Sequence, residues 1–242
     1  MKNQYVGDIG DYGKYGLLRY LANNGIRIGV NWYLTKNDET SHGSLIDYCD
    51  IKQCDVELFD LLQRIVARGK DNKSVIDIEN SKAIPNALFF NEELLQTCPK
   101  DRAEWHKRAL EVLSAEDVDL VFADPDNGTW KRGKQLPRKN GEKYARIEEL
   151  QDYYGSGKDV VYYCHKARRN TNSWEEKKRE FKDVASDASI IVLTFHRGTQ
   201  RSYIFAIHPN NHHKYDSMIR EFLEGAWGTV STNRKKPPFS RE

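Results

Sequence analysis

Short stretches rich in β-branched and aromatic residues alternate along this chain of 242 residues with segments whose apolar residues have helical spacing. The two periodicities distinguish strands from helices. Strands that alternate with helices predict an α/β, Rossmann-like fold, in which helices cover both faces of a mostly parallel sheet. Strands are expected at residues 26–35, 74–78, 87–90, 118–123, 159–165, 189–195 and 201–207, and helices between Asp11 and Gly25 and at residues 56–69, 102–114, 143–153, 173–185 and 211–224.

The end of the chain has a different pattern. Only five residues, 196–200, separate the last two expected strands, so these predict a C-terminal antiparallel hairpin that adds an edge strand to the sheet. No linker rich in proline or glycine divides the chain. Residues 1–227 are therefore expected to form one domain, and residues 228–242 a basic, flexible tail.

The composition argues against several classes of protein. A net charge of +2 predicts no partner by itself. The four cysteines match no zinc-binding spacing and indicate reduced thiols. The first residues lack the apolar core of a signal peptide, and no stretch approaches the roughly 20 apolar residues that span a bilayer. We therefore expect a cytoplasmic protein that does not associate with membranes.

An apolar strand ends abruptly in the sequence VDLVFADPDNG, residues 118–128. Ligands of open parallel sheets bind beyond the carboxyl ends of the strands, which is where Asp124 would lie. His165 and His196 follow two later strands, and the three side chains could meet in one crevice. The alternative is structural: Asp124 caps a turn, and Asp126-Asn127-Gly128 forms it.

The strand followed by Asp124-Pro125 resembles the catalytic motif of class I S-adenosylmethionine-dependent methyltransferases that act on exocyclic amino groups. That motif is Asp/Asn-Pro-Pro followed by an aromatic residue. The resemblance implies that Asp124 and the carbonyl of Pro125 accept hydrogen bonds from the amino group of a base. Asp126 and Asn127 stand where the family has its second proline and its aromatic residue, and Pro125 and Asn127 would shape the base site.

The opening segment GDIGDYGKYGLLR resembles a segment of bacterial large-subunit rRNA adenine-N6 methyltransferases of the RlmJ type. Asp11 and Lys14 match this family, whereas Asp8 and Tyr15 depart from its Asn and His. In that family the segment returns to the catalytic site, which implies that Lys14 and Tyr5 close the site here. The whole chain also resembles a group of uncharacterised bacterial proteins with the same opening and an Asp-Pro-Asp-Asn-Gly centre, which implies no reaction.

The implied cofactor is S-adenosylmethionine, with Asp8, Asp11 and Glu92 as candidate binding residues. A glycine-rich turn normally lets such a cofactor approach the backbone after the first strand. The strand at residues 26–35 instead ends in the bulky sequence Trp-Tyr-Leu, and no Gly-x-Gly follows it.

Two other functions remain open. Asp124, Asp126, His165 and His196 offer the oxygen and imidazole ligands of a divalent metal, as in a metal-dependent nuclease or phosphodiesterase. A third interpretation is a nucleic-acid-binding or interaction protein that has no catalytic activity on the same fold.

Basic loops follow three of the expected strands, and aromatic residues interrupt them. Lysine and arginine neutralise phosphates, and aromatic rings stack on unpaired bases. Solvated loops also carry such charges, but all three open on the side of Asp124. We therefore expect an enzyme that acts on RNA or DNA, with methyl transfer to a base amino group as the leading reaction. The expected nucleic-acid-binding residues are Lys131, Arg132, Lys134, Arg138, Lys139, Arg168, Arg169 and Arg197.

Overall fold

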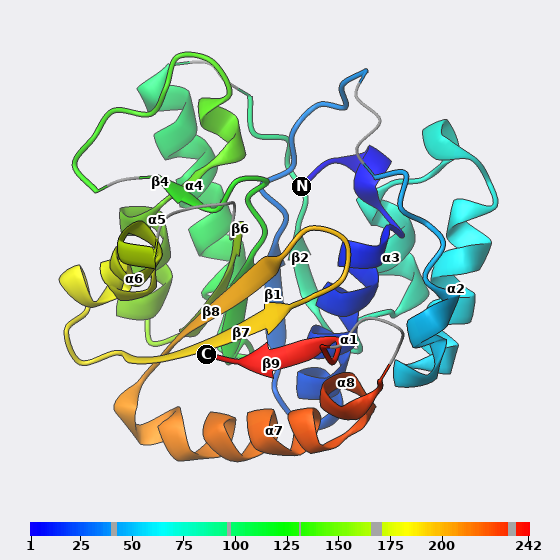
Figure 1. Cartoon of the computed structure of the whole chain (residues 1–242). Helices are drawn as coiled ribbons and strands as arrows, with labels where there is room; N and C mark the ends of the chain where they lie inside the picture. The colour runs from blue at the N-terminus through cyan, green and yellow to red at the C-terminus, as the bar shows by residue number, and fades with distance from the viewer. Residues whose placement is uncertain (40–42, 96–97, 131, 166–170, 232–235) are drawn as a thin grey trace.

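A seven-stranded sheet forms the centre of the computed structural model (Figure 1). The structure describes residues 1–39, 43–95, 98–130, 132–165, 171–231 and 236–242. The order across the sheet is β2-β1-β3-β6-β8-β7-β9. These strands are β1 (Ile28–Asn31), β2 (Leu88–Phe90), β3 (Leu120–Ala123), β6 (Asp159–His165), β7 (Ser189–Phe195), β8 (Arg201–Ile207) and β9 (Phe239–Arg241).

The first four strands of that order are parallel, which confirms the expected α/β class with a mostly parallel sheet. The hairpin differs from expectation in its position. Strand β8 lies inside the sheet, antiparallel to both β6 and β7, and β9 covers β7 at the edge. A separate pair of short parallel strands, β4 (Thr129–Trp130) and β5 (Ala145–Arg146), lies in the basic loop region.

Helices pack on both faces of the sheet, as expected (Figure 1). Alternate residues of β3 point to opposite faces, so Phe122 enters one apolar core and Val121 the other. The core around Phe122 includes α1 (Ile9–Asn23), α2 (Val56–Val66), α3 (Val75–Ser81), α7 (His212–Glu224) and α8 (Ala226–Thr229), and the core around Val121 includes α4 (Pro99–Leu113), α5 (Ile147–Gly155) and α6 (Thr171–Arg179). Short 3-10 helices lie at Asn3–Tyr5, Cys49–Cys54, Lys70–Asn72, Gly141–Lys143, Glu180–Asp183 and Pro209–Asn211. No helix among the described residues combines the length and the apolar character that crossing a membrane requires.

The expected strand at residues 74–78 is wrong, because this segment begins helix α3. The backbone N–H of Ser74 donates to the Asp77 carboxylate at 2.7 Å, and the two residues form a reciprocal capping box. Val75 and Ile78, three positions apart, are both buried. The capping pair and this helical spacing outweigh the β-branched composition.

Both ends of the chain also differ from expectation. Helix α1 begins at Ile9, before the expected start at Asp11, and Asp8 caps it, since its Oδ1 accepts a hydrogen bond from the backbone N–H of Asp11 at 2.8 Å. At the other end, the expected flexible tail includes strand β9. Phe239 is fully buried there, and the Glu242 side chain accepts a hydrogen bond from Thr194 at 2.6 Å. The last residues are therefore held in the sheet.

Three glycines spaced every third residue line one face of α1 and allow it to pack closely on its neighbours. A Cβ atom at Gly13 would lie 2.7 Å from the Phe195 ring, and one at Gly16 would lie 2.1 Å from the Trp227 ring. At the cavity end of the helix, a Cβ at Gly10 would overlap the Arg201 guanidinium. The glycines therefore set the distance from α1 to strands β7 and β8 and to helix α8.

We expect Gly16→Ala to lower the free energy of unfolding by about 1–3 kcal/mol, because the added methyl group would overlap a buried ring. Urea denaturation measures this. The matched control is Gly155→Ala in α5, where a Cβ meets nothing within 4 Å. Removing a flexible residue there should leave stability unchanged or raise it by about 0.5–1 kcal/mol. Equal effects of the two substitutions would contradict close packing of α1.

Candidate functional site

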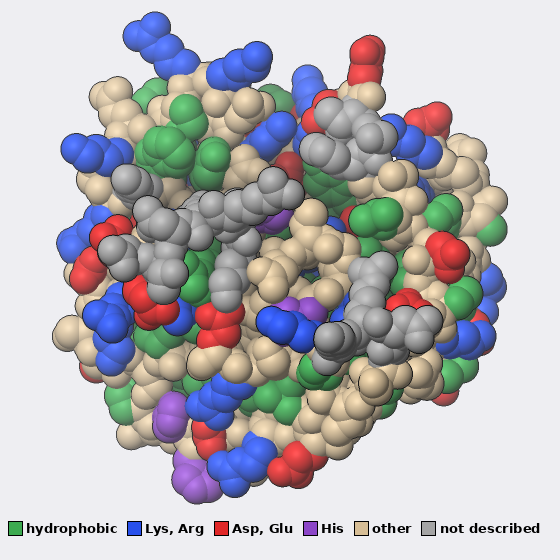
Figure 2. All heavy atoms as spheres, in the orientation of Figure 1, with side chains coloured by type: hydrophobic (Ala, Val, Ile, Leu, Met, Phe, Trp, Pro, Cys, Tyr) green, Lys and Arg blue, Asp and Glu red, His purple; other side chains and the backbone are tan. Residues whose placement is uncertain are grey.

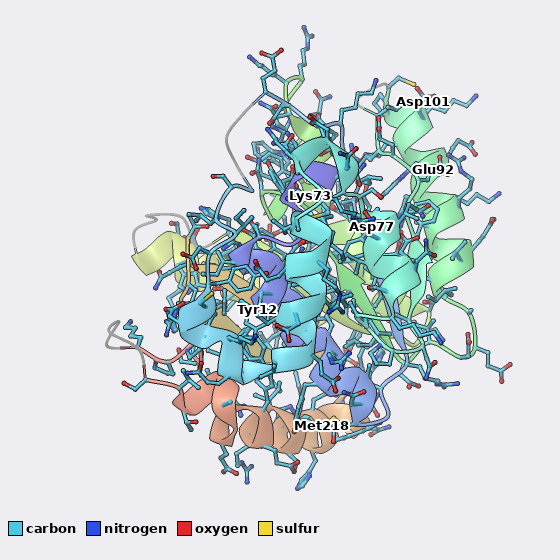
Figure 3. All side chains as sticks on the ribbon, turned by 90° about the vertical axis from the view of Figure 1, so that its right-hand side faces the viewer. Tyr12, Lys73, Asp77, Glu92, Asp101 and Met218 are labelled. Atoms are coloured by element: carbon cyan, nitrogen blue, oxygen red, sulfur yellow. The ribbon has the colours of Figure 1, made fainter. Side chains whose placement is uncertain are left out.

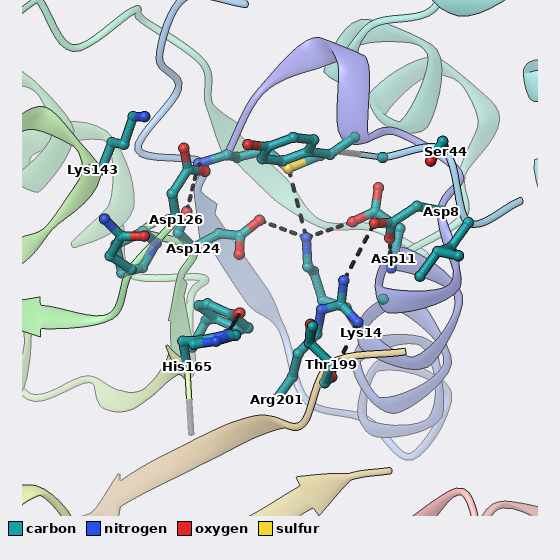
Figure 4. A pocket seen from close by; sticks show the side chains of 18 of the residues that line it. Asp8, Asp11, Lys14, Ser44, Asp124, Asp126, Lys143, His165, Thr199 and Arg201 are labelled. Carbon is teal, nitrogen blue, oxygen red and sulfur yellow. Dashed lines mark hydrogen bonds and ion pairs between the residues drawn. The ribbon is translucent and has the colours of Figure 1, made fainter. Parts of the chain in front are cut away.

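A cavity of about 600 Å³ opens at the carboxyl ends of β3 and β6, beside the N-terminus of α1 (Figure 4). Its position agrees with the expected location of a ligand site in a parallel sheet. The cavity is lined by Met1, Tyr5, Asp8, Gly10, Asp11, Lys14, Gly43, Ser44, Leu45, Asp124, Pro125, Asp126, Asn127, Asn140, Lys143, Tyr163, His165, Thr199 and Arg201.

The ammonium group of Lys14 lies between two carboxylates at the floor of this cavity. Its Nζ is 2.7 Å from Oδ1 of Asp11 and 2.6 Å from Oδ2 of Asp124, and the three side chains are only 3–6% exposed. Burial alone would lower the pKa of Lys14, but the two carboxylates outweigh it and hold the pKa above its usual value. Lys14 is therefore charged, and it ties α1 to the end of β3.

Asp124 lies in the last position before the chain leaves the sheet. Its backbone N–H donates to the carbonyl of Asn31 at 3.0 Å, which continues the ladder between β1 and β3. Burial raises the pKa of the Asp124 carboxyl, and the charge of Lys14 opposes this rise. The residue thus has the partner that a buried carboxylate requires.

Asp126, two residues later, pairs with a second ammonium group. The terminal amine of Met1 lies 2.7 Å from Oδ1 of Asp126. The same amine donates to the backbone carbonyls of Tyr33 at 3.1 Å and Asp124 at 2.9 Å. The Met1 sulfur is 3.8 Å from Nζ of Lys14. The first residue therefore packs against both acids of the Asp-Pro-Asp sequence.

Asp126 and Asn127 form a turn that ends at Gly128, as the structural interpretation of this sequence predicts. The backbone N–H of Asn127 donates to the carbonyl of Lys143 at 2.9 Å. Gly128 has a positive φ of 85°, and a Cβ there would lie 3.0 Å from the sulfur of Cys164. Glycine is needed at that position for both reasons. The strand end supplies Asp124, and the turn then directs the chain toward β4.

Asp8 and Asp11 both line the cavity, but each is engaged in holding the N-terminal segment. The carboxylate of Asp11 also accepts hydrogen bonds from the Tyr15 hydroxyl at 2.8 Å and from the backbone of Gly7 at 3.1 Å. Oδ2 of Asp8 is 3.3 Å from the Arg201 guanidinium. Burial raises the pKa of Asp8, and Arg201 opposes the rise.

Two aromatic residues and a histidine complete the walls of the cavity. His165, at the end of β6, is 3.2 Å from the Tyr163 hydroxyl through Nδ1. Tyr5 is partly buried, and burial raises the pKa of its phenol, with a further contribution from Asp126. The structure thus brings Tyr5, Lys14, Asp124 and His165, all of them candidate site residues, to one cavity.

Three predicted site residues lie elsewhere. His196 contacts Ser240 at 2.7 Å through Nε2, beside β9, and does not line the cavity. Arg197 is fully buried, so it does not present its charge to nucleic acid. Glu92 lies beside α4 (Figure 3) and binds Arg108, which lowers the pKa of its carboxyl. In the sequence these residues lie just after expected strands. In the structure they pack or form ion pairs outside the cavity.

The basic loop after β4 borders the cavity through residues that the sequence analysis did not single out. Asn140 and Lys143 line it, and so does Arg201 at the start of β8. Lys143 belongs to a basic segment, and this could have identified it from the sequence as a candidate site residue. Nothing in the sequence indicates that Arg201 reaches α1. Among the predicted nucleic-acid-binding residues, Arg132, Lys134, Arg138 and Lys139 are exposed, while Lys131, Arg168 and Arg169 lie outside the described residues.

The metal-centre hypothesis finds no support in the part of the chain that the structure describes. No group of three or more His, Cys, Asp or Glu side chains there is arranged to hold an ion. Asp124 and Asp126 each face an ammonium group, which repels a cation.

The end of β1 does not fit S-adenosylmethionine bound in the usual way. Trp32 and Tyr33 follow the strand directly and are fully buried, and Tyr33 has a positive φ of 42°. The side-chain oxygen of Asn31 accepts the backbone N–H of Tyr33 at 3.0 Å, which fixes this bend. Bulky side chains therefore fill the position where a glycine-rich turn would admit the cofactor.

We expect Lys14→Met to lower the free energy of unfolding by about 3–5 kcal/mol at neutral pH, because two buried carboxylates would lose their shared cation. The pKa of Asp124 should then rise further. Stability is lost as the pH rises through a raised carboxyl pKa, so the deficit should shrink as the pH falls.

Urea denaturation from neutral to mildly acid pH measures this deficit. Lys107→Met is the control, because that side chain is 71% exposed on α4 and its removal should change stability by less than about 0.5 kcal/mol. The double variant Lys14→Met/Asp124→Asn should recover part of the loss. If Lys14→Met were as stable as the control, the contacts of Lys14 with Asp11 and Asp124 would not be what holds α1 against the sheet.

Comparisons with known proteins give a likeness at the level of structure and none at the level of sequence. No family model matches this sequence, and no curated protein matches it. Among solved structures, the chain is similar to protein LPL1258 from Legionella pneumophila str. Philadelphia 1, which is described under the family model DUF519. The two chains are 11% identical, the alignment covers 99% of this chain and 97% of the other, and the TM-score is 0.47.

Proposed function

We propose that this protein binds single-stranded nucleic acid and that its cavity receives an unpaired base bearing an exocyclic amino group. One observation carries the proposal: Asp124 and Pro125 line a cavity of about 600 Å³ at the end of a central strand. This volume lies within the range of small-molecule sites, about 300–1,000 Å³. A single base with its sugar fits within such a space.

The floor of the cavity offers acceptors for an amino group. Lys14 contacts Oδ2 of Asp124, so Oδ1 is the oxygen that would accept the amino hydrogen, together with the carbonyl of Pro125. The charge of Lys14 favours the ionised form of Asp124 against the effect of burial, and an ionised acceptor makes the stronger hydrogen bond. The ring of Tyr5, also in the lining, supplies a face on which a base can stack.

The charge beside the cavity supports a polynucleotide in preference to a free base. Arg132, Lys134 and Lys139 are exposed on the loop that reaches the cavity through Asn140 and Lys143. Phosphates along a single strand would interact with these cations, and the interaction would weaken as salt rises.

Methyl transfer to the amino group is the second candidate, because Asp124-Pro125 lies where that chemistry would need it. The buried Trp32 and Tyr33 do not fit the cofactor, so we derive no catalytic step from it. Nucleic-acid binding by this cavity is therefore the primary proposal, and it holds with or without a methyl donor.

Replacing the base tests the primary proposal without changing the protein. We expect a single-stranded oligonucleotide with one central adenine to bind about tenfold more tightly than the same strand with hypoxanthine, which lacks the amino group. Fluorescence anisotropy of labelled strands at low and moderate salt gives both affinities. The fully paired duplex should bind more weakly than either strand, because its bases cannot enter the cavity.

Equal affinities for adenine and hypoxanthine would contradict the proposed amino-group contact. An affinity that does not change between low and moderate salt would contradict the phosphate contacts.

Titration calorimetry with S-adenosylmethionine addresses the second candidate. We expect no saturable heat up to millimolar cofactor in protein freed of any co-purified ligand, because Trp32 and Tyr33 fill the end of β1. Saturable binding that Asp8→Asn weakens would instead place the cofactor in the cavity and favour methyl transfer.

A further inference from the structure

We propose that a second cavity binds the sugar and phosphate of the nucleotide next to the base held at Asp124. This inference rests on the proposed function and extends it, since it makes the ligand a strand of at least two nucleotides. The second cavity measures about 370 Å³ and lies between the N-terminus of α4 and the loop that joins β4 to β5.

One short segment separates the two cavities. Asn140 and Lys143 line the first cavity, whereas Gly141 and Glu142, which lie between them in the sequence, line the second. These residues belong to the 3-10 turn Gly141–Lys143 and its cap. A strand that enters the first cavity would therefore meet the second after passing over a single turn of the chain.

The second cavity has an excess of positive charge. Arg102, Arg138 and Arg146 line it, with Glu142 as the lining acid. Arg102 already binds Glu149, from Nε at 2.6 Å and from Nη2 at 2.8 Å, so its charge is balanced within the protein. The two other arginines, Arg138 and Arg146, and the carboxylate of Glu142 together give one net positive charge. This charge suits the single negative charge of a phosphodiester.

The side chain of Arg146 gives the most specific evidence for a bound phosphate. Its Nε is buried and has no hydrogen-bond partner among the described residues. A buried guanidinium N–H without an acceptor is costly, and native structures rarely leave one. A phosphate oxygen is the acceptor that arginine matches best, and the Arg146 side chain, which lines the cavity, would turn to bring its covered Nε to such an oxygen.

Apolar side chains border these arginines. Leu95 is 48% exposed, and Leu136 and Pro137 are half-buried in the lining of the cavity. In the region of α4 and the β4–β5 loop, at the upper left of Figure 1, Figure 2 shows hydrophobic side chains flanked by lysines and arginines. Such a surface can cover a sugar or a base while the guanidinium groups hold its phosphate.

The test compares ligands with and without a phosphate. The probes are a fluorescently labelled pentanucleotide of DNA with one central adenine, measured by anisotropy, and adenosine, measured by calorimetry. The variants are Arg146→Gln and Arg138→Gln. Lys107→Gln is the matched control, because it removes one exposed charge from α4 outside the lining of either cavity.

We expect each arginine variant to weaken pentanucleotide binding about tenfold and to reduce the salt slope by about one phosphate contact. Adenosine, which has no phosphate, should bind both variants as it binds the unmodified protein. The control should differ from the unmodified protein by less than about twofold.

Three results would overturn the inference, and they are distinguishable. If the arginine variants bind the pentanucleotide as tightly as the Lys107→Gln control does, the second cavity does not bind the phosphate. The proposed function of the first cavity would then be unaffected. Failure of the unmodified protein to bind either probe would overturn both. Loss of adenosine binding in both arginine variants would show that they disturb the first cavity, and it would also count against a separate phosphate site.

Discussion

One buried ammonium group, that of Lys14, joins the two parts of the molecule from which the site is built. It lies 2.7 Å from Asp11 on its own helix and 2.6 Å from Asp124, which is 110 residues away in the sequence. Each carboxylate would be costly to bury alone, and one cation offsets both. Because of this pairing, the N-terminus of α1 lies against the carboxyl edge of the sheet, and the cavity opens at their junction.

The remaining contacts depend on that placement. The glycine face of α1 brings the helix close to Phe195 and Trp227, and Arg201 reaches across to Asp8 at the mouth of the cavity (Figure 4). The segment before the helix then folds over Asp126, where the amine of Met1 pairs with its carboxylate. Segments far apart in the sequence thus supply the floor and the walls.

The sheet could be predicted from the sequence because strand and helix periodicities are local. Asp124 could be placed at a strand end for the same reason, since it follows a fully apolar run. The helix at residues 75–81 was missed because a capping pair outweighs composition there. The position of a strand within the sheet depends on its tertiary neighbours. The interior place of β8 therefore could not be inferred from its hairpin loop.

The roles of individual charges were harder to predict than the fold. Arg197 and Glu92 looked available in the sequence, but one is buried and the other binds Arg108. Lys14 and Asp124 were correctly brought together, although only by resemblance, and their direct contact is a tertiary feature with no local pattern. The aromatic residues after β1 were visible in the sequence, and their burial explains why the expected cofactor does not fit.

The most direct test of the central claim is a crystal structure of the protein with a single-stranded oligonucleotide that carries one adenine. We expect the adenine in the cavity, with its amino group within hydrogen-bond distance of Oδ1 of Asp124 and its ring against Tyr5. Lys14 should keep both of its carboxylate contacts in that complex. An oligonucleotide bound elsewhere on the surface, with the cavity empty, would contradict the claim that this cavity is a base-binding site.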